Sequence, residues 1–201
     1  MQELVKQTDC RIHRIVEFLD MENGEEFVQS VTQTFESPNP DVELFIKNKS
    51  IQATKLSTAS SYLICSKKFF PNIELVGYFT LATKMLNITR ESMSKSTERI
   101  INRFGYYDEL SDSYHIPAIL IAQFGRNFNE SCSTISGNDL MLLTLNQVKY
   151  IMSLSSGKTV FLECEKKNKL IDFYRENGFS LLDNEVLSKD KKQLVQLYRF
   201  L

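Results

Sequence analysis

The stretch that decides the fold of this 201-residue chain lies near its end: Thr159-Val-Phe-Leu-Glu-Cys-Glu165, followed by Phe173-Tyr-Arg-Glu-Asn-Gly-Phe179. The first segment is rich in β-branched and large apolar residues and predicts a buried strand. The second predicts the end of a helix over about 168–177, because Gly178 is a natural C-terminal stop. Together they place Tyr174 on a helix near the end of a buried strand, where a phenolic hydroxyl can carry chemistry.

The segments before this unit predict a crossover. Ile116–Phe124 is a near-continuous apolar run, typical of a strand buried on both faces. A helix from about Gly137 to Leu154 links it to the strand Thr159–Glu163, so the two strands should be parallel. Residues 179–183 and 193–201 predict a closing antiparallel pair.

The rest of the chain alternates short strands and helices. We expect strands over 10–19, 60–66 and 73–82, and helices over 24–35, 42–56 and 90–103. Lys67–Asn72 contains Pro71 and predicts a turn, and Gly105–His115 predicts a polar, exposed loop.

Composition limits the class of protein. The chain is 42% hydrophobic and 24% charged with a net charge of −1, which is ordinary for one soluble globular domain spanning residues 1–201. The near-neutral charge argues against a broad nucleic-acid footprint but leaves a local basic patch open. No apolar run is long enough to span a bilayer, and the first residues lack a signal-peptide core, so we expect a cytoplasmic protein with no membrane contact.

The metal-ligating side chains are dispersed. No two of the four cysteines form a C-x-x-C pair, and His13 lies far from His115 in the sequence. We therefore expect no metal site and a reducing compartment. The cysteines are Cys10, Cys65, Cys132 and Cys164.

The start of the helix near Gly137 is a candidate phosphate site. Ser136-Gly-Asn-Asp139 fits a capping box, and Gly137 lets the backbone approach a ligand closely. The positive end of the helix dipole suits an anion. Taken alone, the same pattern is equally that of an ordinary capped helix.

Taken together, these motifs resemble the GNAT N-acetyltransferases over roughly residues 42–201. The similarity is strongest in Leu162–Phe179, which ends in a Phe-Tyr-x-x-x-Gly-Phe pattern, and is supported by Leu75-Val-Gly-Tyr-Phe-Thr-Leu81 and Ile116–Gly125. The resemblance implies an α/β (α+β) fold: a mixed, partly open sheet flanked by helices. It also implies a splayed parallel strand pair that forms a wedge for acetyl-CoA, the expected co-substrate.

The resemblance assigns roles to individual residues. Tyr174 would be the general acid near the thioester sulfur, and Asn168, which could also cap its helix, would lie near the pantetheine. Glu163 is a candidate base or a solvated strand-end residue, with Glu74 and Gln123 as weaker candidates. Backbone groups of Phe124 and Arg126 would bind the pantetheine, and amides of Ile135, Ser136, Gly137 and Asn138 would bind the pyrophosphate.

One stretch departs from the family pattern. The family loop usually reads Gln/Arg-x-x-Gly-x-Gly/Ala, whereas this chain has Cys132-Ser-Thr-Ile-Ser-Gly137. No lysine or arginine lies between Asn127 and Asp139, and Glu130 and Asp139 add negative charge. The loop Cys132–Gly137 should therefore bind a pyrophosphate less tightly than the usual family loop does.

The resemblance implies an enzyme that transfers acetyl from acetyl-CoA to a primary amine on a small molecule, a peptide or an aminoacyl-tRNA. One alternative is an aminoacyl-tRNA-acetylating toxin of a toxin–antitoxin pair, for which Lys47, Lys49 and Lys55 with Lys67 and Lys68 could form a basic surface. A solvated helix face explains the first three equally well. Another alternative, favoured by the unusual loop, is a non-catalytic acyl-CoA-binding module. The acidic stretch Tyr106–Asp112 is either a solvated loop or an attractor of a cationic amine, and a homodimer stays open.

Overall fold

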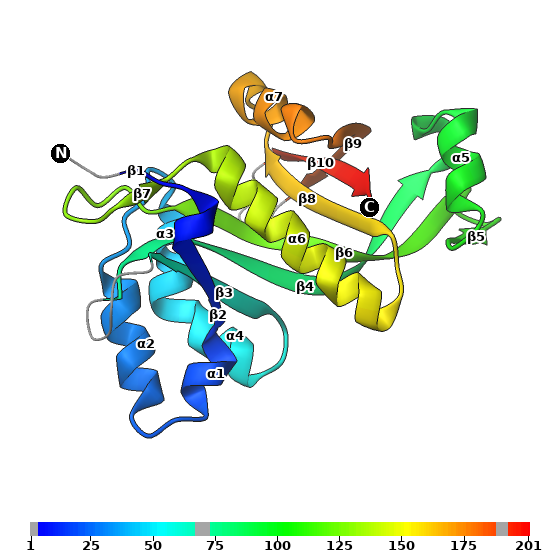
Figure 1. The fold of residues 1–201 in the computed structure, drawn as a ribbon. Coiled ribbons are helices and arrows are strands. Elements are labelled where there is room, and N and C mark those ends of the chain that lie inside the picture. Colours follow the sequence, from blue (N-terminus) through cyan, green and yellow to red (C-terminus); the bar gives the residue numbers. More distant parts are fainter. Residues whose placement is uncertain (1–3, 67–72, 188–192) are drawn as a thin grey trace. The chain divides into compact units, whose positions relative to one another are not determined.

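The computed structural model describes residues 4–66, 73–187 and 193–201 (Figure 1). The chain forms two compact units: unit 1 comprises Met1–Ala82 and Ala122–Asn146, and unit 2 comprises Thr83–Ile121 and Gln147–Leu201. Three elements continue from one unit into the other, namely β4 (Leu75–Thr89), β6 (Ser113–Arg126) and α6 (Gly137–Ser155). The expected turn Lys67–Asn72 lies outside the described residues, and the expectation of one domain over 1–201 stays a prediction.

Unit 1 is built from short helices on an antiparallel set of strands. Strands β2, β3 and β4 pair antiparallel in that order, and β1 pairs parallel with β7. The remaining elements are β1 (Leu4–Val5), a 3-10 turn (Gln7–Asp9), β2 (Cys10–Arg14), α1 (Ile15–Leu19), α2 (Gly24–Gln33), α3 (Pro40–Leu44), a π-helical turn (Phe45–Lys49), α4 (Ser50–Lys55), β3 (Ser60–Ser66) and β7 (Thr134–Ile135).

The core of unit 1 centres on Tyr78 of β4. Its ring packs edge-on against Phe35 with centroids 5.1 Å apart, and its hydroxyl donates to the carbonyl of Val42 at 2.5 Å. A Cβ on Gly125 would lie 2.7 Å from the Val42 side chain, so only glycine fits this position of β6 without displacing its neighbours. The other buried members are Ile15, Val28, Val31, Ile46, Leu63, Cys65 and Leu75.

Unit 2 contains the parallel pair. Strands β6 and β8 pair parallel from Ile119 opposite Val160 to Ile121 opposite Leu162, and β8-β10-β9 continue antiparallel. Strand β5 pairs antiparallel with β6. The elements are a 3-10 turn (Arg90–Ser92), α5 (Lys95–Ile101), β5 (Tyr106–Asp108), β8 (Thr159–Glu165), α7 (Asn168–Glu176), β9 (Ser180–Leu187) and β10 (Gln193–Phe200).

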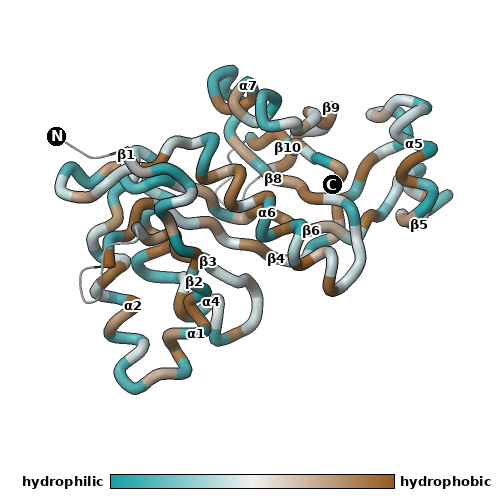
Figure 2. Tube along the Cα trace, in the orientation of Figure 1, coloured by the Kyte–Doolittle hydropathy of each residue, from teal (hydrophilic) through white to brown (hydrophobic). Residues whose placement is uncertain are grey.

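Unit 2 has an apolar core of its own, centred on Phe161 of β8 and Ile101 of α5. In contrast, Figure 2 shows α7 as largely hydrophilic. The buried residues of α7 are Ile171 and Tyr174. The other buried members of the core are Leu86, Ile88, Tyr114, Ile116, Ala118, Leu182 and Tyr198.

The expected fold class is confirmed: helices flank a mixed sheet that is mostly antiparallel and contains one parallel pair. The strand 60–66, the helices near 24–35, 137–154 and 168–177, and the closing antiparallel pair also form as expected. The expected helix 42–56 forms as helical turns from Pro40 to Lys55, interrupted by the π-helical segment.

Three expectations about single elements are wrong. The strand expected over 10–19 ends at Arg14, because the Arg14 backbone N–H donates to the Glu17 carboxylate at 3.2 Å and starts α1. The expected loop 105–115 contains β5, which pairs Tyr106–Asp108 with the start of β6. The expected helix 90–103 begins only at Lys95, where Ser94 Oγ accepts from the Thr97 N–H at 3.1 Å.

The expectation that the strand at 116–124 is buried on both faces is also wrong. Ile116, Ala118 and Ile121 are buried, but Pro117 is exposed and Leu120 is half-buried. The face with Ile116 and Ala118 is therefore well buried near the start of the run, whereas on the face with Pro117 only Ile121 is buried. Within the described residues, no helix is long and apolar enough to cross a bilayer.

Candidate functional site

The Phe-Tyr-x-x-x-Gly-Phe pattern is a Schellman motif that ends α7. The N–H of Phe179 donates to the carbonyl of Tyr174 at 3.0 Å, and the N–H of Gly178 donates to that of Arg175 at 2.9 Å. These are the two bonds that define the motif, and Gly178 has the left-handed φ of +79° that it requires. The rings of Tyr174 and Phe179, which the motif brings together, lie 6.0 Å apart. The spacing of the pattern therefore has a local physical cause: it holds Tyr174 in place.

A side chain from β10 completes this helix end. Arg199 donates through Nη1 to the carbonyl of Asn177 at 2.6 Å. A Cβ added to Gly178 would lie 3.0–3.2 Å from three atoms of the Arg199 guanidinium. Gly178 is thus constrained both by its backbone conformation and by the cation beside it.

The Tyr174 side chain lies in an apolar, sulfur-containing environment within unit 2. It is 8% exposed, packs edge-on against Phe173 with centroids 5.1 Å apart, and lies near the thiol of Cys164 on β8. Burial, and to a lesser degree Cys164, raises the pKa of Tyr174 well above its usual value. Burial also raises the pKa of Cys164 to about 11, with a smaller contribution from Glu165. At neutral pH the phenol therefore keeps its proton and is a donor.

Glu163 lies on β8 but faces away from this environment. Successive side chains of a strand point to opposite faces, so Glu163 faces the side opposite to Cys164. Glu163 is exposed and accepts a hydrogen bond from Gln196 Nε2 of β10 at 2.8 Å. Asn168 is the first residue of α7 and is exposed, and the position before the helix is occupied by Lys167, so Asn168 is not the cap.

In unit 1, Ser136 caps the start of α6 as expected. The Asp139 side chain, however, bonds to the Ser136 hydroxyl and not to the Ser136 backbone N–H as in a standard capping box. Ser136 Oγ accepts from the Asp139 N–H at 3.0 Å, and its hydroxyl donates to the Asp139 carboxylate at 2.6 Å. Gly137 and Asn138 occupy the first turn of α6. Ile135 is buried in β7 opposite Val5. The helix start can offer backbone amides to an anion, while the Asp139 carboxylate opposes its charge.

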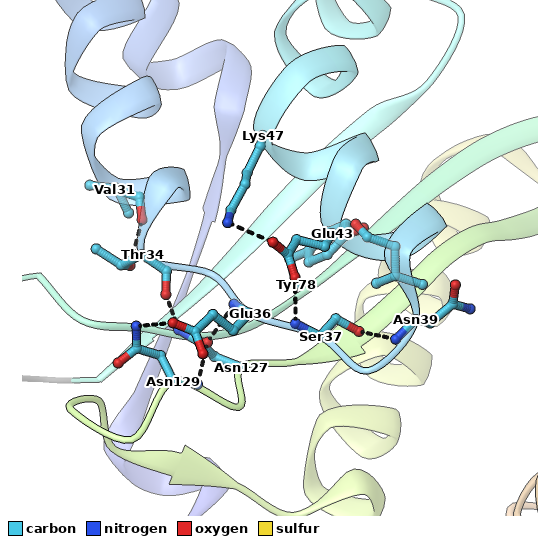
Figure 3. Close-up of polar contacts among 11 residues, drawn as sticks. Val31, Thr34, Glu36, Ser37, Asn39, Glu43, Lys47, Tyr78, Asn127 and Asn129 are labelled. Atoms are coloured by element: carbon cyan, nitrogen blue, oxygen red, sulfur yellow. Dashed lines mark hydrogen bonds and ion pairs between the residues drawn. The ribbon is translucent and has the colours of Figure 1, made fainter.

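The loop before α6 is tied down by Asn127, a residue that the sequence did not single out. Asn127 is 1% exposed, and Figure 3 shows it beside Glu36 and Asn129. Its Oδ1 accepts from the N–H of Glu36 at 2.9 Å and of Asn129 at 3.0 Å. Its Nδ2 donates to the carbonyls of Leu75 at 2.7 Å and Thr34 at 3.3 Å. One side chain therefore joins the end of α2, the start of β4 and the loop.

Glu74 provides a second anchor. Its carboxylate accepts from Ser133 Oγ at 2.7 Å and from the Ser133 N–H at 3.3 Å. Glu74, a weak candidate base in the sequence, thus serves to hold the loop. Asn127 and Glu74, together with the β1–β7 pairing, hold the loop before α6 in place.

The end of β6 presents Phe124 and Arg126. Phe124 is half-buried, and Arg126 is exposed with its guanidinium 4.4 Å from the centre of the Phe128 ring. Arg126 is the cation that directly precedes the loop in the sequence. Its charge partly offsets the acidic residues of the loop.

The basic group considered for RNA is partly neutralised. Lys47 pairs with Glu43 at 2.8 Å, and Lys55 pairs with Glu25. These lysines therefore belong to solvated ion pairs of the helices, as the simpler interpretation held. Lys67 and Lys68 lie outside the described residues.

Comparison with solved structures identifies the fold. AtaT complexed with acetyl-methionyl-tRNAfMet matches with a TM-score of 0.61 and 18% identity, covering 93% of this chain and 94% of that chain. A KacT mutant with a tyrosine replaced by phenylalanine matches with a TM-score of 0.62 and 16% identity, covering 94% and 95%. AtaTR bound with AcCoA matches with a TM-score of 0.55 and 15% identity, covering 95% and 92%.

The chain has the GNAT acetyltransferase fold. No family model matches the sequence, and no curated protein matches it. The similarity therefore rests on three-dimensional structure, and it extends over nearly the whole length of the chain. The GNAT resemblance predicted from the sequence is confirmed at the level of the fold.

Proposed function

We propose that the chain is an N-acetyltransferase that moves acetyl from acetyl-CoA to a primary amine, with Tyr174 as general acid. The observation that carries this proposal is the buried, protonated phenol of Tyr174, held by a Schellman motif and by Arg199. Similar structures include one bound with AcCoA, which supports acetyl-CoA as co-substrate.

In the proposed reaction, the acceptor amine attacks the thioester carbon, a C–N bond forms and the C–S bond breaks. The Tyr174 hydroxyl gives its proton to the departing sulfur. A phenol with a raised pKa gives up its proton only to a strong base, and an apolar environment also raises the basicity of a thiolate beside it. Burial therefore raises the pKa of the phenol and that of the thiol formed from the departing thiolate together, so proton transfer between them stays favourable.

The attacking amine must lose a proton, and we propose that Glu163 receives it. Because Glu163 faces the side of β8 opposite to Cys164, the proton would reach it through water. Its carboxylate is exposed on β8 and already accepts from Gln196. An amine that arrives neutral needs no strong base. Glu163→Gln should therefore reduce turnover less than Tyr174→Phe.

In unit 1, we propose that the start of α6 binds the pyrophosphate through backbone amides of Ile135, Ser136, Gly137 and Asn138. The positive helix end fits an anion, and the anchored loop needs little ordering on binding. The Asp139 carboxylate reduces the affinity. We further assign backbone groups of Phe124 and Arg126, and the side chain of Asn168, to the pantetheine.

We propose aminoacyl-tRNA as a second candidate acceptor. The supporting observation is the likeness to AtaT complexed with acetyl-methionyl-tRNAfMet over 93% of this chain. An aminoacyl ester carries the primary amine that this chemistry needs. We place the activity in the cytoplasm, since Cys10, Cys65, Cys132 and Cys164 are all free thiols.

The decisive experiment measures CoA release by wild type and Tyr174→Phe with a panel of small amines and with aminoacyl-tRNA. We expect the phenylalanine variant to lose about 100-fold or more in kcat, the range typical of a missing general acid. Calorimetry with acetyl-CoA serves as the control, because both proteins should bind it equally. Unchanged CoA release would exclude the acid role, and binding without turnover in wild type would indicate a non-catalytic acyl-CoA-binding module.

A further inference from the structure

Helix α5 of unit 2 carries three cations in one row. Lys95, Arg99 and Arg103 are spaced by four residues, which places them on one side of the helix and its final turn. All three are exposed. Within the described residues, none of them forms an ion pair.

This row costs the helix stability. Lys95 and Arg99 are like charges four residues apart within the helix, which is unfavourable, and a helix of seven residues has little stability of its own. Glu98, the acidic residue of α5, does not offset the row. It pairs with Arg90 at 2.9 Å and accepts from the Tyr114 hydroxyl at 3.1 Å.

An exposed aromatic ring follows the row. Tyr106 begins β5, is 69% exposed, and stacks on His115 with ring centroids 6.3 Å apart and planes inclined by 28°. His115 is held by a 2.7 Å hydrogen bond between its Nδ1 and Asn87 Oδ1. A large, supported ring open to solvent is a suitable platform for stacking with a planar group.

The turn between α5 and β5 fixes the ring relative to the row. The Gly105 N–H donates to the carbonyl of Ile101 at 2.7 Å, and a Cβ on Gly105 would lie 2.9 Å from the Ile101 side chain. Ile101 is fully buried in the core of unit 2. Helix α5, the turn and strand β5 are therefore packed together, and Figure 1 shows the two elements as neighbours.

Two of the three acidic residues in the stretch Tyr106–Asp112 have local structural partners. Asp108 accepts from the Leu110 N–H at 3.1 Å and from Ser111 Oγ at 2.6 Å, and Asp112 accepts from the Tyr107 hydroxyl at 2.5 Å. They shape the turn at the far end of β5, three residues after the glycine. These bonds explain Asp108 and Asp112 without a cationic substrate, and Glu109 between them is exposed.

We propose that the α5 surface, defined as Lys95, Arg99, Arg103 and Tyr106, binds RNA: the three cations contact backbone phosphates, and Tyr106 stacks on an unpaired base. Basic residues interleaved with an exposed aromatic ring match the chemistry of a single-stranded polyanion with planar bases. The inference rests on the proposed aminoacyl-tRNA acceptor and locates the surface that holds its RNA part.

The test uses fluorescence anisotropy of a labelled tRNA transcript with a free 3′ single strand, titrated with full-length protein without acetyl-CoA. The variant Lys95→Gln/Arg99→Gln/Arg103→Gln should weaken binding about 100-fold in 0.1 M salt. It should also lower the slope of log K against log salt by about 2, since each phosphate contact contributes roughly 0.7–0.9. Tyr106→Ala should weaken binding about 10-fold with an unchanged salt slope, because stacking releases no counterions.

The matched control is Lys6→Gln/Arg11→Gln/Lys149→Gln, which removes the same number of exposed positive charges at positions outside the α5 surface. This control should bind RNA like wild type. Equal weakening by the two triple variants, or none by the α5 variant, would overturn the inference. Displacement of the tRNA by polyglutamate as effectively as by unlabelled RNA would also overturn it, in favour of an acidic protein partner.

Acetylation of a small amine separates this inference from the proposed function. The α5 variant should acetylate a small amine at the wild-type rate while losing RNA binding. If wild type acetylates small amines but does not bind RNA, the RNA surface is wrong and the enzymatic proposal stands. If wild type binds RNA through α5 but releases no CoA with any amine, the enzymatic proposal fails and the RNA surface stands.

Discussion

Replacing Asn127 by alanine should destabilise unit 1 more than any ordinary polar substitution. The side chain is 1% exposed and makes four hydrogen bonds at 2.7–3.3 Å, to Thr34, Glu36, Leu75 and Asn129. Its removal leaves two backbone N–H groups and two carbonyls without this partner.

The magnitude follows from the burial of each bond. The bond to Leu75 is buried and the other three are partly buried. An unsatisfied buried group costs about 1–3 kcal/mol, whereas a partly exposed group recovers most of its loss by binding water. We therefore expect Asn127→Ala to lower the free energy of unfolding by about 3–4 kcal/mol.

Urea unfolding followed by circular dichroism measures this loss, because the chain contains no tryptophan for fluorescence. Asn127→Asp should be destabilised as well, since it keeps the acceptor oxygen but loses both donated bonds. Asn146→Ala is the control: Asn146 is exposed on α6, and alanine favours a helix, so its stability should not fall. An Asn127→Ala stability within about 0.5 kcal/mol of wild type would refute the role of this network.

Three further predictions concern the other supports of the site. Gly178→Ala should destabilise the protein by about 2 kcal/mol in thermal unfolding, because alanine is strained at φ +79° and its Cβ crowds Arg199. Ser156 also has φ +79°, so the control variant Ser156→Gly should stabilise the protein. Glu74→Gln should bind acetyl-CoA at least as tightly as wild type in calorimetry, since an amide oxygen can still accept from Ser133 and a negative charge is lost. Glu74→Ala should bind more weakly, and a tighter-binding alanine variant would contradict the anchoring role. Burial raises the pKa of Cys65 to about 12 and of Cys164 to about 11, so both folded thiols hold their protons more tightly than unfolded ones. Their contribution to stability should be complete below about pH 8.5 and decline as pH rises through these values, and iodoacetamide at about pH 8 should modify partly exposed Cys10 first.

Local sequence was enough to predict the helices and strands whose apolar residues recur at a regular spacing within one segment. The strand 60–66, the helix beginning at Gly137 and the closing antiparallel pair form where their apolar spacing predicts them. The position of Tyr174 is also local, since every hydrogen bond of the Schellman motif joins residues at most five apart. For this reason the seven residues Phe173–Phe179 indicate a helix end on their own, and with the other motifs they support the resemblance to the GNAT fold.

Long-range contacts, in contrast, set how this helix end and the loop before α6 are held. Arg199 reaches Asn177 from 22 residues away, Ser133 reaches Glu74 from 59, and Glu36 reaches Asn127 from 91. A single polar side chain leaves no periodic signal, and its partner is chosen by how strands and helices pack. The same reason explains β5, whose pairing with β6 depends on a neighbouring strand and not on the polar composition of its own residues.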